Sequence, residues 1–102
     1  MKENVLYAAQ GFVVGKDWMG GIGTYDSECL TAKTFEELKE KAAASFESGY
    51  LEDGFGFEKL LAAKLRVVKN IEAVINGKTY TRREYLENML IGDEKYLKMI
   101  HL

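Results

Sequence analysis

The sequence has little with which to build a catalytic or metal centre. It has one cysteine, one histidine and no proline in 102 residues. A single cysteine excludes an internal disulfide, which fits the reducing conditions of the cytoplasm. Cys29 is expected to be a small buried residue. No spacing of Cys, His or carboxylates matches a zinc site or a calcium loop. We therefore expect no metal, no cofactor and no catalytic residues.

An enzyme would need pairs of residues that the sequence does not bring together by itself. The two candidate pairs are Asp26 with Glu28, and Cys29 with His101, and each would have to meet in a cleft. An enzyme is therefore the least favoured of the hypotheses for this chain.

Long apolar runs and a strong charge of one sign are also missing. No run approaches the ~20 apolar residues of a membrane helix, and the N-terminus lacks the long apolar region and cleavage site of a signal peptide. The formal net charge of −2 gives no general attraction for nucleic acid. The expectation is one domain over residues 1–102, cytoplasmic, with no membrane and no direct nucleic-acid binding.

The residues that are present predict a small α+β fold. Two T-x-x-E capping boxes, at Thr34 and Thr81, each precede an apolar run that ends at a glycine, which is typical of helices. Asn76-Gly77 is typical of a two-residue hairpin turn. The predicted elements are strands over 4–14, 22–32 and 62–70, a hairpin of 72–75 with 78–80, helices over 35–48 and 82–91, and a helical turn or a strand within 94–102. The expected order is β-β-α-β-hairpin-α, with the helices on one face of a mainly antiparallel sheet.

The stretch GKDWMGGIGTY, residues 15–25, is rich in glycine. It matches neither a Walker loop nor a dinucleotide fingerprint, because its glycines open an expected strand rather than a helix. Two readings stay open: a flexible seven-residue connection, or a contact loop in which Trp18 and Met19 meet a partner. Phe55 and Phe57, in a second glycine-rich stretch, would extend that surface if the two loops converge. Otherwise these aromatics anchor their loops to the core.

Four cationic residues are candidates for binding an anion or an acidic partner. Lys64 and Arg66 are expected on one face of a strand, and Arg82 and Arg83 at the N-terminus of the second helix. Arginine at a helix N-terminus suits phosphate or carboxylate. The alternative is that these side chains are simply solvated.

Two longer runs carry a resemblance. The chain resembles small accessory proteins of bacteriophages and other mobile elements in the runs GIGTYDSECLTAKTFEELKEKAAASFESG and VINGKTYTRREYLENMLIGDEK. The resemblance implies a phage setting, the cytoplasm of the host cell, and a role among inhibitors of host defence such as anti-CRISPR proteins.

The leading hypothesis is a non-catalytic binding protein that occludes a host effector, such as a CRISPR nuclease. Trp18, Met19, Phe55 and Phe57 would supply apolar area, and the four cations would meet acidic groups. One alternative is sequestration of a small nucleotide immune signal. The other is a structural or assembly protein that forms a dimer or larger oligomer through a sheet edge, with acid-rich and base-rich halves paired between copies.

Overall fold

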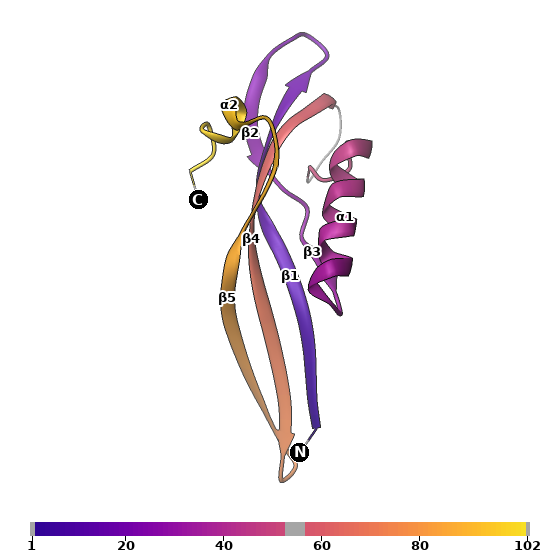
Figure 1. Cartoon of the computed structure of the whole chain (residues 1–102), viewed down its shortest axis with the longest axis vertical. Helices are drawn as coiled ribbons and strands as arrows, with labels where there is room; N and C mark the ends of the chain where they lie inside the picture. Colours follow the sequence, from indigo (N-terminus) through magenta and orange to yellow (C-terminus); the bar gives the residue numbers. More distant parts are fainter. Residues whose placement is uncertain (1, 53–56, 102) are drawn as a thin grey trace.

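The computed structural model describes residues 2–52 and 57–101 and contains a five-stranded antiparallel sheet with two helices (Figure 1). The elements, in chain order, are β1 Lys2–Asp17, β2 Ile22–Asp26, β3 Leu30–Ala32, α1 Phe35–Ser48, β4 Phe57–Ile75, β5 Lys78–Gly92 and α2 Glu94–Leu97. The strand order is β2-β1-β4-β5, and β3 pairs with β1 beside β2. The expected α+β class with a mainly antiparallel sheet is confirmed.

Helix α1 forms as its sequence predicts. Thr34 is the N-cap, and its Oγ1 accepts a hydrogen bond from the Glu37 N–H at 3.1 Å. Gly49 ends the helix at φ 80°, a left-handed conformation that glycine adopts without strain. The stripe of Phe35, Leu38, Ala42 and Phe46 lies against the sheet, with Leu38 and Ala42 fully buried.

The sheet has two faces, because side chains alternate along each strand. The face under α1 carries Ala9 and Val13 of β1 with Ala63, Leu65 and Val67 of β4, which form the main core. We call the opposite side the open face. At one end of it, Val14 and Ala62 pack against Ile100, just after α2. The two helices therefore lie on opposite faces, and the expectation of one shared face is wrong.

The predicted helix over 82–91 is also wrong, because these residues lie in β5. The hairpin turn at Asn76-Gly77 forms, with φ of 51° and 78°. The strands that it joins pair from Ile75 with Lys78 as far as Ala62 with Gly92, well beyond the short flanks expected. Pairing with β4 thus overrides the local helix signal of a T-x-x-E motif.

The predicted strand over 22–32 is divided in two. Ser27 is fully buried, and its Oγ accepts the Gly11 N–H at 2.8 Å while its own N–H bonds the Gly11 carbonyl at 2.9 Å. These two hydrogen bonds lie between β2, which pairs with residues 12–16 of β1, and β3, which pairs with residues 7–9.

The molecule is elongated, with extents of 57 × 22 × 20 Å and a radius of gyration of 15.7 Å. A compact chain of this length has a radius of about 13 Å. The extra length comes from residues 2–6, 69–75 and 78–84, a three-stranded extension that continues past the N-terminal end of α1 (Figure 1). We call this segment the fin.

Candidate functional site

Trp18 and Met19 lie at the tip of the turn between β1 and β2. Trp18 is 72% exposed and Met19 96% exposed. The turn is closed by the Asp17 N–H, which donates to the Gly21 carbonyl at 2.9 Å, and by the Gly20 N–H, which donates to the Asp17 carbonyl at 3.1 Å. This is a short hairpin turn rather than the seven-residue loop expected from the sequence.

The carboxylate of Asp17 holds this turn together. Its Oδ1 accepts the backbone N–H groups of Met19 and Gly21, both at 2.8 Å. Gly20 has φ 87°, and a Cβ at Gly21 would lie 2.8 Å from Asp17 Oδ2, so both glycines serve the turn. A carboxylate thus already takes the Met19 and Gly21 N–H groups that a bound phosphate would need. It presents two exposed apolar side chains on an ordered backbone.

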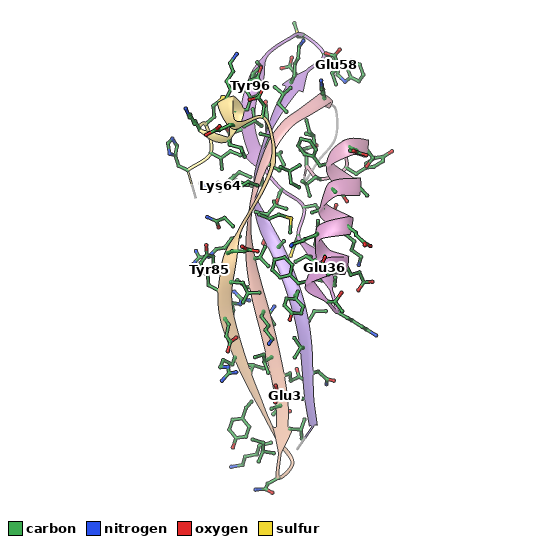
Figure 2. All side chains as sticks on the ribbon, in the orientation of Figure 1. Glu3, Glu36, Glu58, Lys64, Tyr85 and Tyr96 are labelled. Atoms are coloured by element: carbon green, nitrogen blue, oxygen red, sulfur yellow. The ribbon has the colours of Figure 1, made fainter. Side chains whose placement is uncertain are left out.

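The second half of the expected aromatic surface is only partly described. Phe55 lies outside the described residues. The backbone of Phe57 begins β4 and pairs with Asp17, the residue that precedes Trp18. Glu58, next along β4, is labelled near the same end of the molecule as the β1–β2 turn in Figure 2. The described end of the second stretch, from Phe57 on, therefore adjoins the same end of the sheet as the Trp18–Met19 turn.

The four cationic candidates divide between the two faces. Lys64 and Arg66 lie on one face of β4, as expected, and this is the open face. Arg83 shares that face, since it pairs with Asn70 of β4. Arg82 points to the opposite face, where its Nη2 lies 3.0 Å from Glu84 Oε1. Adjacent residues on a strand face opposite ways, so the expected cluster of Arg82 with Arg83 at a helix N-terminus is wrong.

Two neutral side chains hold the arginines of the open face. Arg83 Nε donates to Asn70 Oδ1 at 3.1 Å. The Arg66 guanidinium lies 4.7 Å from the centre of the Tyr85 ring, within the range of a cation–π contact. Figure 2 shows Tyr85 and Lys64 on the side of the sheet away from α1, which carries Glu36.

Tyr85 and Asn70 were not recognised as site residues from the sequence, although a signal for them exists. A two-residue turn at Asn76-Gly77 fixes the register of both flanking strands. Counting outward from it pairs Asn70 with Arg83 and Val68 with Tyr85, as observed. The short hairpin predicted from the sequence stopped before these pairs.

The residues named for a catalytic reading lie apart or outside regular structure. Cys29 is exposed, not buried as expected, and lies beside Ala8 and Gln10. His101 follows Ile100, which packs on Val14, about 20 Å further along β1 than Ala8. Asp26 ends β2, and Glu28 lies beyond it. Among the described residues, no three His, Cys, Asp or Glu side chains are grouped to hold a metal.

Neither helix in the described part of the chain is long and apolar enough to cross a membrane. No protein-family model, curated protein or solved structure matches this chain.

Proposed function

We propose that this chain is a non-catalytic binding protein that occludes a partner protein through the Trp18–Met19 turn. The observation that carries the proposal is the combination of exposure and order in this turn. Trp18 is 72% exposed, while the backbone that follows it is fixed by hydrogen bonds from the Met19 and Gly21 N–H groups to the Asp17 carboxylate. A large aromatic side chain on a preorganised turn loses little conformational entropy when it binds.

Tryptophan is among the residues that contribute most to protein interfaces, and methionine adapts to irregular apolar surfaces. The likeness to phage accessory proteins supports a host-defence effector, such as a CRISPR nuclease, as the partner. The protein would then act in the host cytoplasm by blocking a surface that the effector needs.

A plaque assay tests this proposal. Cells with a CRISPR nuclease and a guide against a phage would express the wild-type chain, Trp18→Ala or Tyr50→Ala. Tyr50 is 77% exposed just after α1, so Tyr50→Ala is a matched loss of an exposed aromatic residue. We expect the wild-type chain and Tyr50→Ala to restore plaques. Trp18→Ala should lose at least about 30-fold in affinity for the nuclease, the effect of removing an interface hot spot, and should restore fewer plaques.

The assay separates the two parts of the proposal. A wild-type chain that restores no plaques against a panel of nucleases would remove the CRISPR target. Equal activity of Trp18→Ala and the wild type, at equal protein levels, would remove the turn as the contact.

A second candidate function is self-association through β5. Within the described residues, β5 pairs only with β4, so its outer edge is open along fifteen residues. Tyr80, Leu86 and Leu90 are 53%, 37% and 57% exposed along this edge strand. An open edge of this length is a template for another strand. The dependence of molecular mass on protein concentration tests this candidate.

A further inference from the structure

The open face contains two adjoining hollows that share their basic residues. One, of about 450 Å³, is lined by Arg66, Val68, Arg83 and Tyr85. The other, of about 210 Å³, is lined by Arg66, Val68 and Arg83 again, together with Gln10, Asn70 and Cys29. The larger hollow lies within the range of small-molecule sites, roughly 300–1,000 Å³. Because Arg66 and Arg83 line both hollows, the two form one depression between β1, β4 and β5.

The contacts of these arginines leave donors available to a ligand. Arg83 uses Nε to reach Asn70 Oδ1, so both of its terminal nitrogens remain for another acceptor. The Arg66 guanidinium lies 4.7 Å from the centre of the Tyr85 ring, and within the described residues its N–H groups make no hydrogen bond or ion pair. Each side chain is thus oriented by a neutral partner that does not cancel its charge.

Among the described residues, neither Arg66 nor Arg83 forms an ion pair with an acid. In the described part of the chain, the ion pairs join Lys39 to Glu36 and Arg82 to Glu84. Arg66 and Arg83 line the same hollow, so their like charges repel each other, and an anion between them removes that repulsion. Arginine matches phosphate oxygens with paired, charge-assisted hydrogen bonds.

We propose that the open face binds a nucleoside phosphate. The phosphate lies between Arg66 and Arg83, and Lys64, two residues from Arg66 on the same face, meets a second phosphate group. The base lies against Val68 and the exposed part of the Tyr85 ring, where aromatic and apolar atoms accept a flat ring. The side-chain amides of Gln10 and Asn70 supply hydrogen bonds to polar edges of the base or sugar.

Calorimetry with AMP, ADP, inorganic phosphate and adenosine tests the site. We expect ADP to bind more tightly than AMP, and AMP at least tenfold more tightly than phosphate or adenosine. Arg66→Gln and Arg83→Gln should each weaken ADP binding about tenfold or more. Arg82→Gln, a neighbour on the opposite face, should change it less than twofold. Thermal melts would establish that all three variants are folded.

The single cysteine gives a second measurement at the same place. Cys29 lines the smaller hollow, so bound ADP should slow its reaction with a thiol reagent in the wild type and not in Arg83→Gln. Trp18→Ala should bind ADP like the wild type, which separates this site from the proposed partner contact.

Three outcomes would overturn the proposal. The first is no binding of ADP at millimolar concentration. The second is an equal loss in Arg82→Gln and Arg83→Gln, which would indicate a general charge effect. The third is a short single-stranded oligonucleotide that binds at least tenfold more tightly than ADP with a steep salt dependence, which would assign the face to nucleic acid.

Discussion

At the scale of single residues, Gly92 is a position where the fold depends on the absence of a side chain. It ends β5 at φ 93°. A Cβ added there would overlap the carbonyl oxygen of Leu61 and lie 2.8 Å from the Cα of Ala62. The close approach occurs where the Asp93 N–H bonds the same Leu61 carbonyl, at 3.3 Å, just before α2 begins. Gly92 was expected to end a helix, and it instead ends a strand.

We predict that Gly92→Ala lowers the free energy of unfolding by roughly 2–4 kcal/mol, from left-handed strain together with overpacking. Gly20→Ala is the control, since Gly20 has a similar φ of 87° but open space around it. It should lose only the strain, about 1–2 kcal/mol. Urea unfolding of both variants measures the difference, and equal losses would contradict the steric argument.

At the scale of elements, the two T-x-x-E motifs show what local sequence can and cannot decide. At Thr34 the motif caps α1, and Glu37 Oε2 reaches back to the Lys33 N–H at 3.3 Å. At Thr81 the same motif lies inside β5. The difference is the partner strand, because the Asn76-Gly77 turn brings residues 78–92 alongside β4 before a helix can form.

We predict that Thr34→Val destabilises the protein by about 1 kcal/mol, the typical loss of an N-cap oxygen. Thr81→Val, the same change in the second motif, should stay within about 0.5 kcal/mol, as for an ordinary surface position. Thermal or urea unfolding compares the two. A loss at Thr81 as large as that at Thr34 would show that its hydroxyl has a structural role not visible in these contacts.

The limits of prediction in this chain have a physical cause in β5. Its alternation is interrupted by an irregularity between the pairs formed by Val67 and Val68, where Glu87 and Tyr85 are the partners and Leu86 is left over. This bulge places Tyr85 and Met89 on opposite faces of a strand, although their spacing of four suits one face of a helix. Helix α1 has no such break, and its bounds, cap and buried stripe all follow from local residues.

The sequence likewise predicts only part of the candidate site. Placing Lys64 and Arg66 on one face required only the alternation of a strand. Adding Arg83, and separating Arg82 from it, required the pairing of β4 with β5 over fourteen residue pairs, which depends on contacts distant in sequence. The order of the turn that carries Trp18 comes from hydrogen bonds to Asp17 that composition alone does not indicate.

At the scale of the whole molecule, the fin raises the question of what its surfaces contact. It extends beyond α1, yet Leu6, Val74 and Ile75 are each 40–42% exposed within it. Three strands without a covering layer have little apolar burial to stabilise them. Within the described residues, the fin ends at the outer edge of β5, which pairs with no further strand. An identical edge matches it in length and in exposed apolar side chains, which favours a second copy as the partner.

We predict that the chain forms a dimer through paired β5 edges. In a two-residue hairpin the pair that flanks the turn, Ile75 with Lys78, is hydrogen-bonded, and hydrogen-bonded pairs then recur at every second residue. Thr81 falls between two such pairs, so its N–H points to the outer side of β5. Proline is tolerated at such a position, since it removes an outward donor and no bond to β4. Sedimentation equilibrium between about 10 μM and 1 mM should give a mass that rises to twice the monomer for the wild type and remains monomeric for Thr81→Pro.

Amide hydrogen exchange decides whether β5 is the edge involved. In a β5-paired dimer, the outward N–H groups of residues 79, 81 and 83 gain protection as the protein concentration rises, because they enter a new ladder. The amides of 2–6, on the opposite side of the fin, then stay unchanged and serve as an internal control. Protection at 2–6 instead of 79–83 would place the contact on β1. A monomer at 1 mM with a rapidly exchanging fin would show that the sheet stands without a second copy, and β5 would then be open to a different chain.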